Sequence, residues 1–493
     1  MRHSLTRREA LASLVAAPVL LALGRQARGA GAPIRPHDLG PLAEKLRTCT
    51  RDEALDVAAK AIRGGAGLEA MLGAIFQAGI YDVRPRHVGG KLHAVMIVES
   101  IFRLAAATDR RSGWLLALWN LDDFKRSQEL DRQEGDWVMP RRPSVSSARE
   151  AAARREFLAA MDAWDDERAD RALVGLLPSH TLDSVFEILW PLAARSYVNI
   201  GHKIIYAVQT RRVLERTGWD SAEPALRSLV YALLHQPSGR DADLFQHTRE
   251  VAESLPARLR LGEKDPAHGR GLLAELRTLD SLAAQKRVVR ALEEGVAAGT
   301  VWDALRAWAS ELFLRRLKSQ PANDRAALLP VHSVTVINAF GYAWRKTRSE
   351  ATRRLLLLQA TGWLPRLRDD LIAIVGLGPA SRVIDELGRG VEERAAPPED
   401  LLQDPTPDAV RARLGDPFHM SAYQAQLVAH LARKAVEAHQ HKYAAAVFEE
   451  SQLVDSSWAP YLLACAVPYL PGNEEAETEL SRRSLHAIAK AGV

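Results

Sequence analysis

Cysteine is scarce in this chain of 493 residues, which contains only Cys49 and Cys465. Two cysteines exclude a disulfide-rich scaffold and a zinc site built from cysteine alone. An oxidising compartment would permit a bond between them, but Cys465 lies in the apolar segment 462–466, where a buried free thiol is common. We therefore predict two free thiols.

Aromatic residues make up only 6% of the chain, and alternating runs of β-branched residues are nearly absent. This scarcity argues against β-sheet domains. Alanine, leucine, arginine and glutamate dominate instead, and apolar residues recur at steps of three and four, as in Leu182, Val185, Phe186 and Leu189. The sequence predicts an all-α, multi-helix array of roughly twenty helices, arranged as irregular, solenoid-like helix pairs without a fixed repeat period.

Two proline-rich segments, 140–143 and 395–398, read as linkers. They divide the chain into an N-terminal helical region (33–140), a central one (144–394) and a C-terminal one (399–493). We expect these regions to pack as one continuous body.

The first 32 residues have the pattern of an export signal. Arg7 and Arg8 precede an uncharged stretch from Ala10 to Leu23, and 30–32 is a small-residue cleavage pattern. The paired arginines indicate a twin-arginine signal peptide over 1–32, although Ala10 stands where a bulky apolar residue is usual. We expect a periplasmic or extracellular protein that has no membrane span after signal removal. The alternatives are an ordinary signal and a single membrane anchor.

A clustered excess of positive charge is also missing. The whole chain carries +5, and residues 1–32 carry five arginines and one glutamate, so the remainder is about +1. A nucleic-acid partner is therefore not expected.

The sequence lacks a Walker loop, a His-Glu-x-x-His zinc motif, a Gly-x-Ser-x-Gly elbow and a Cys-x-x-Cys-His haem attachment. Gly376 and Gly378 form a weak dinucleotide fingerprint, but Ser381 replaces the third small residue. We interpret this segment as a helix C-cap and turn, and NADPH binding is not expected.

Three helices are predicted to begin in the same way, with a helix breaker followed by histidine. Gly89-Gly90 precedes His93, Gly201 precedes His202, and Pro330 precedes His332. Each histidine heads an apolar stripe, so its ring is expected to face inward near a helix N-terminus, where the helix dipole favours the neutral imidazole. A neutral imidazole is what a metal ligand or a general base requires.

A fourth histidine is expected from the segment 438–443, where His439 and His441 do not share a helix face. We select His441 because it lies beside Lys442 and Tyr443. The sequence-based hypothesis is a metal or haem site with His93, His202, His332 and His441 as metal ligands, the first three as catalytic residues. Tyr206 and Lys442 are expected to contact the cofactor. Alternatively, each histidine is a hydrogen-bonded core residue.

The segments 201–207 and 331–335, and more loosely Leu92-His93-Ala94, resemble helix-opening histidine motifs of the questin oxidase-like proteins. These motifs cover under a tenth of the chain. The resemblance implies a helical fold and a redox role for His93, His202 and His332, because that group includes NADPH-dependent oxygenases that open aromatic quinone rings.

Together these features predict an exported oxidoreductase that acts on a small organic molecule in a histidine-lined pocket. The alternative is a non-catalytic helical binding or scaffolding protein of the bacterial envelope.

Overall fold

A computed structural model describes residues 40–493 apart from 87, 143–149, 220–221, 238–240, 316–324, 375, 378–383, 388–405 and 415–416. These residues form 22 α-helices, three short 3-10 helices and no β-strand, which confirms the all-α prediction. The predicted signal segment 1–32 and the linker 395–398 lie outside the described residues. Within the described chain, no helix combines the length and apolarity needed to cross a membrane.

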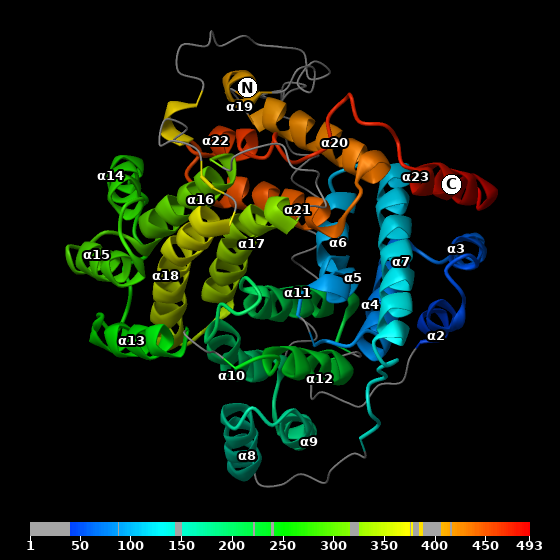
Figure 1. The fold of residues 1–493 in the computed structure, drawn as a ribbon, viewed down its shortest axis with the longest axis horizontal. Coiled ribbons are helices and arrows are strands. Elements are labelled where there is room, and N and C mark those ends of the chain that lie inside the picture. The colour runs from blue at the N-terminus through cyan, green and yellow to red at the C-terminus, as the bar shows by residue number, and fades with distance from the viewer. Residues whose placement is uncertain are drawn as a thin grey trace, which may run out of the picture.

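The N-terminal part packs around one long helix. Its elements are α2 (Pro41–Thr48), α3 (Ala54–Arg63), α4 (Leu68–Asp82), η1 (Gly90–Leu92), α5 (His93–Met96), α6 (Val98–Ala105) and α7 (Arg110–Gln133). Asp109 fixes the start of α7, because its side chain accepts hydrogen bonds from the backbone N–H groups of Arg111 and Ser112. The helix then packs against α4, α6, α20 and α23 (Figure 1).

The central part contains two long helices, α17 and α18, that pack along each other. Its helices are α8 (Glu150–Asp162), α9 (Asp166–Leu176), η2 (Leu177–Ser179), α10 (Leu182–Ala194), α11 (His202–Thr217), α12 (Ala222–Leu233), α13 (Asp241–Ser254), α14 (Pro266–Leu276), α15 (Ser281–Glu293), α16 (Ala298–Leu314), α17 (Arg325–Lys346), α18 (Glu350–Ile374) and η3 (Ile384–Glu386).

The C-terminal part brings α21 back into the middle of the molecule, where it packs against α6 and α17. The elements here are α19 (Pro407–Arg413), α20 (Pro417–Lys434), α21 (Ala438–Leu453), α22 (Ala459–Ala464) and α23 (Glu479–Lys490).

Four helices from these three parts form a closed ring around the centre of the fold. Helix α11 packs against α6 and α17, and α21 packs against the same two helices from the other side. Figure 1 shows α11 crossing the middle of the molecule, between α17 and the pair α5 and α6. Residues that line the inside of this ring are far apart in sequence and close in space.

Two smaller predictions are also resolved. Cys49 and Cys465 are both free thiols, and Cys465 is buried. Gly376 follows the end of α18 with φ 76°, and its N–H bonds to the carbonyl of Leu371 at 2.9 Å. This is the helix-ending turn that we predicted; Gly378 and Ser381 lie outside the described residues.

Candidate metal centre

A glycine turn positions the first histidine. Gly89 and Gly90 have φ angles of 120° and 50°, which glycine adopts far more readily than other residues. This turn leads through η1 into α5 and places the carbonyl of Gly90 against the ring three residues later. His93 Nδ1 donates to that carbonyl over 2.8 Å.

A left-handed turn of three residues positions His202. Asn199, Ile200 and Gly201 have φ angles of 53°, 58° and 74°, and this conformation is strained for a β-branched residue such as isoleucine. A Cβ atom at Gly201 would lie 2.7 Å from Val336 Cγ2, so the close approach of α17 requires glycine. The turn directs the carbonyl of Asn199 at the ring, and His202 Nδ1 donates to it.

His332 lies inside α17 rather than at its start. The helix begins at Arg325 and continues through Pro330, so the prediction that this proline marks the helix start is wrong. Leu329 and Val331 are buried on either side of the proline, and their packing holds the helix where local propensity would end it. The ring still faces inward, and His332 Nδ1 donates to the carbonyl of Leu328 over 2.8 Å.

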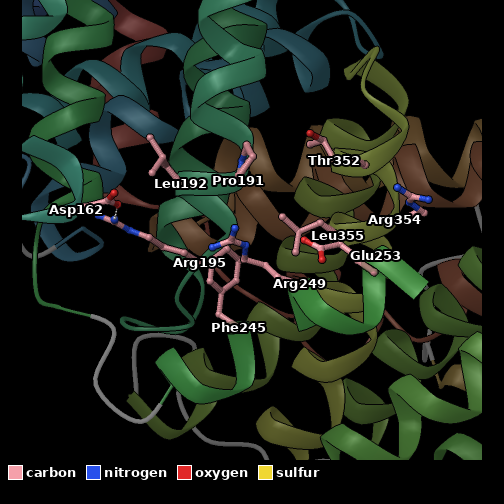
Figure 2. A pocket seen from close by; sticks show the side chains of 12 residues that line it. Asp162, Pro191, Leu192, Arg195, Phe245, Arg249, Glu253, Thr352, Arg354 and Leu355 are labelled. Carbon is pink, nitrogen blue, oxygen red and sulfur yellow. Dashed lines mark ion pairs between the residues drawn. The ribbon is translucent and has the colours of Figure 1, made fainter. Parts of the chain in front are cut away.

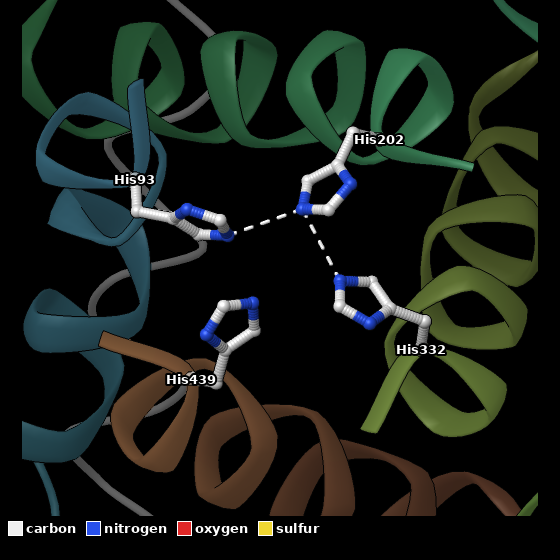
Figure 3. Close-up of side chains that lie close together, drawn as sticks. All are labelled: His93, His202, His332 and His439. Carbon is white, nitrogen blue, oxygen red and sulfur yellow. Dashed lines mark hydrogen bonds between the residues drawn. The ribbon is translucent and has the colours of Figure 1, made fainter. Parts of the chain in front are cut away.

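The three predicted histidines converge on one point at the centre of the helix ring. His202 Nε2 lies 3.1 Å from His93 Nε2 and 3.1 Å from His332 Nε2 (Figure 3). His439 joins them from α21, and one ring nitrogen from each of the four lies within 4.8 Å of the others. All four side chains are buried. The predicted convergence of His93, His202 and His332 is confirmed.

The fourth histidine is His439 and not the expected His441. The His441 ring lies on a different face of α21 and packs against Trp119 of α7, with ring centroids 4.4 Å apart. A local signal favours His439, because it lies three residues before Lys442 and shares its helix face, whereas His441 is directly adjacent to Lys442. Glu437 gives a second signal, since it is an acidic N-cap that also reaches the ring.

Of the two residues expected to contact a cofactor, one lies against the histidines. Lys442 Nζ is 3.3 Å from His93 Nε2 and 3.2 Å from His332 Nε2. Tyr206 is buried but bonds elsewhere, because its hydroxyl lies 2.8 Å from Ser228 Oγ on α12.

Hydrogen bonds at Nδ1 determine where each ring carries its proton. The Nδ1 partners of His93, His202 and His332 are backbone carbonyls, which only accept hydrogen bonds. The partner of His439 Nδ1 is the Glu437 carboxylate, at 2.7 Å. Each neutral ring therefore has its hydrogen on Nδ1 and a lone pair on Nε2.

The surroundings oppose a positive charge on these rings. Burial lowers the pKa of His93, His202 and His332 well below the ordinary value, and Lys442 lowers it further. Burial also lowers the pKa of His439, although the Glu437 carboxylate acts in the opposite direction. The pKa of Lys442 itself falls to about 7 because this amine is buried.

Glu437 is surrounded by hydrogen-bond donors. One oxygen accepts the backbone N–H of His439 at 2.8 Å in addition to the ring N–H. The other accepts the backbone N–H of Gln440 at 2.9 Å and the hydroxyl of Tyr469. Burial alone would raise the pKa of Glu437, but His439 and the other donors hold it below its usual range. A carboxylate is the form that can accept from all four groups.

A small cavity lies beside Lys442, which forms part of its wall. Its volume is about 10 Å³, room for one water molecule. Its other lining residues come from α6, α11 and α17 as well as α21. Arg212 and Asn338 are among them; Arg212 pairs with Glu449 over 2.7 Å, and Asn338 donates to the same carboxylate over 2.8 Å.

Two larger cavities are lined by residues other than the four histidines. One, of about 360 Å³, lies between α10, α13 and α18, and Figure 2 shows Arg195 extending along its edge toward Asp162, 3.9 Å away. The other, of about 600 Å³, is lined by Arg84, Arg86, Glu134 and residues 234–236. Two residues of its wall contact lysines that lie close to the histidines in sequence. Glu134 bonds to Lys91 of η1, and the carbonyl of Gln236 accepts from Lys203 of α11.

The structure alone shows that the four histidines converge. Comparison with protein-family models, with curated proteins and with solved structures gives no match for this chain. The resemblance to questin oxidase-like proteins stays a prediction.

Proposed function

We propose that this protein binds a divalent transition-metal ion through the Nε2 atoms of His93, His202, His332 and His439. The observation that carries the proposal is the short distance between ring nitrogens that have no hydrogen to share. His202 Nε2 faces two other Nε2 atoms at 3.1 Å, and in the tautomer set by the Nδ1 bonds none of the three carries a hydrogen. Lone pairs this close repel one another unless a cation lies between them.

A proton is a poor candidate for that cation, because burial disfavours the imidazolium form of these rings. The Lys442 amine reaches His93 and His332, and a single amine does not account for the packing of all four rings. A metal ion bound to all four nitrogens removes the repulsion at both contacts of His202 Nε2.

Two of the nitrogen–nitrogen spacings match those of ligands on one metal ion. Two nitrogens 2.0–2.1 Å from one ion lie about 2.9 Å apart at a right angle and about 3.4 Å apart at the tetrahedral angle. The 3.1 Å contacts at His202 fall between these values. The partners at Nδ1, three carbonyls and one carboxylate, are those that metal-bound histidines usually have.

The ligand set also restricts the kind of ion. Four imidazoles suit zinc, copper, iron and nickel, whereas magnesium and calcium require oxygen ligands. The ion would keep its full double charge, because all four ligands are neutral.

Oxidoreductase chemistry on a small organic molecule is the function we assign to this centre. It is supported by an imidazole set that suits redox-active ions, and by the resemblance of the segments around His202 and His332 to questin oxidase-like proteins. Lys442 is placed to contact a group that shares the centre with the ion.

Metal analysis of paired variants tests the proposal. His439→Gln removes a ligand, whereas His441→Gln changes a buried histidine on the same helix that lies outside the centre. We expect one ion per chain in the wild type and in His441→Gln, and a loss of about 10-fold or more in affinity in His439→Gln. Equal metal content in the two variants would remove His439 from the site. A wild type that binds no transition metal would favour the non-catalytic binding or scaffolding protein.

A further inference from the structure

The four histidines are not equivalent, because one of them has an ionised partner. His93, His202 and His332 each donate from Nδ1 to a neutral backbone carbonyl. His439 donates to the carboxylate of Glu437 over 2.7 Å. A carboxylate draws the Nδ1 proton more strongly than a carbonyl does and makes the ring a better electron donor.

Glu437 in turn has a hydrogen-bond partner of its own, Tyr469. The tyrosine hydroxyl donates to Oε1, the carboxylate oxygen that does not bind the ring. This bond withdraws charge from the carboxylate and limits its pull on the His439 proton. Tyr469 is buried beside the rings of Phe313 and Tyr443, with centroids 5.5 and 5.6 Å away, so its hydroxyl is held in place.

We propose that Glu437 and Tyr469 form a positioning pair that sets the reduction potential of the bound ion through His439. Glu437 strengthens this ligand and so favours the more oxidised ion, and Tyr469 moderates the effect. Neither residue is placed to bind the ion. The inference rests on the proposed metal binding and adds to it the identity of the residues that tune the centre.

The two residues act in opposite directions, and this gives a test that a merely structural role would not satisfy. Copper is the probe, because both its oxidation states bind imidazole. Glu437→Gln replaces the carboxylate by a neutral amide that still accepts a hydrogen bond. We expect it to weaken copper(II) binding about 10- to 100-fold and to affect copper(I) less. Each tenfold difference between the two losses raises the potential by about 59 mV.

Tyr469→Phe should have the opposite sign. It leaves the carboxylate in place and removes a donor from it, so the pull on the His439 proton increases and copper(II) is favoured. We expect the reduction potential to fall below that of the wild type. Tyr443→Phe is the matched control, because it removes a neighbouring hydroxyl that points to the carbonyl of Cys465 instead.

The measurement is a mediated potentiometric titration of the copper-loaded full chain, followed by the copper(II) electron paramagnetic resonance signal. The expected result is a rise for Glu437→Gln, a fall for Tyr469→Phe and no change for Tyr443→Phe. Shifts of the same sign in the first two variants, or no shift in either while copper still binds, would overturn this inference alone. A wild type that binds no copper or other transition metal would overturn the proposed function instead.

Discussion

At the scale of single residues, the chemistry of the centre depends on backbone carbonyls that the chain directs at imidazole rings. The carbonyls of Gly90 and Asn199 belong to turns with positive φ angles, and each fixes the proton of the next histidine along the chain. The conformation of these turns therefore determines where the Nε2 lone pairs of His93 and His202 point.

Gly201 gives a prediction at this scale. Gly201→Ala places a methyl group 2.7 Å from Val336 Cγ2 and in a left-handed conformation. We expect a loss of about 2–4 kcal/mol in the free energy of unfolding, from backbone strain and overpacking together. Urea denaturation followed by circular dichroism measures it.

Gly65→Ala is the control for that experiment. Gly65 has a φ of 91° in the turn that ends α3, but an added Cβ would meet nothing within 4 Å. It should lose only the strain contribution, about 1–2 kcal/mol. Equal losses at the two positions would mean that contact with α17 does not hold the turn before His202.

The histidines show how far residue patterns alone can lead. A helix breaker before His93 and His202 was sufficient to predict inward-facing rings, because such turns and the stripes that follow are local features. Adjacency to Lys442 and Tyr443 is a different signal, and it favours His441, whereas the helix face that carries Lys442 also carries His439. The identity of the Nδ1 partners depends on turn geometry, which residue types do not specify.

At the scale of helices, buried charges join the ring of four. Arg212 of α11 pairs with Glu449 of α21 at 2.7 Å and approaches Glu99 of α6 at 3.7 Å. Asn338 of α17 donates to Glu449 and, over 2.6 Å, to Glu450. These contacts connect all four helices.

Removing one member of this network should lower the free energy of unfolding substantially. Arg212→Met leaves Glu449 and Glu99 buried with less compensation, and we expect a loss of about 3–5 kcal/mol in the free energy of unfolding. Glu479→Gln, which removes an exposed pair with Arg482, should cost less than about 1 kcal/mol. Chemical denaturation compares the two, and similar losses would show that the buried network contributes little.

The same network predicts a pH dependence of stability. Burial alone would raise the pKa of Glu449, but Arg212, Arg103 and Arg345 hold it far below the ordinary value. The folded chain then binds fewer protons at this site than the unfolded chain, whose glutamates titrate near about 4.3. The stabilisation is therefore complete at neutral pH and is lost as the pH falls through 4.3 and below.

Urea midpoints between about pH 7 and pH 3 check this effect. We expect a steep decrease for the wild type and a flatter one for Glu449→Gln, which lacks the titrating group. Parallel curves for the two proteins would contradict the role of Glu449.

Helix content was predictable from composition and from apolar spacing, and the described chain confirms it. The boundaries of the helices were less predictable. Pro330 was expected to begin a helix and instead lies within α17, because burial of Leu329 and Val331 outweighs the local effect of proline. Tertiary packing of this kind is not encoded in any short window of sequence.

At the scale of the whole molecule, the centre draws on distant parts of the chain. His93 belongs to the predicted N-terminal region, His202 and His332 to the central one, and His439 to the C-terminal one. Their meeting depends on the packing of α6, α11, α17 and α21, which sequence spacing does not reveal. A metal ion bound there would link all three regions and stabilise the folded chain.

Export is a prediction at this scale and concerns residues 1–32, which lie outside the described residues. Replacing Arg7 and Arg8 together by lysine should block the twin-arginine route and leave the precursor inside the cell. Fractionation followed by immunoblotting measures it, with the wild type processed near Pro33 as the control. Unchanged export of the variant would contradict the assignment of the route.

The most direct test of the central claim is X-ray absorption spectroscopy of the purified full chain at the edge of its bound metal. The proposed centre predicts a single transition metal, with nitrogen neighbours about 2.0–2.1 Å away and the outer-shell scattering that imidazole rings produce. At a metal concentration that just saturates the wild type, the signal should fall in His439→Gln and be kept in His441→Gln. A protein without a transition metal, or a bound metal surrounded by sulfur or by oxygen atoms alone, would contradict the four-histidine centre.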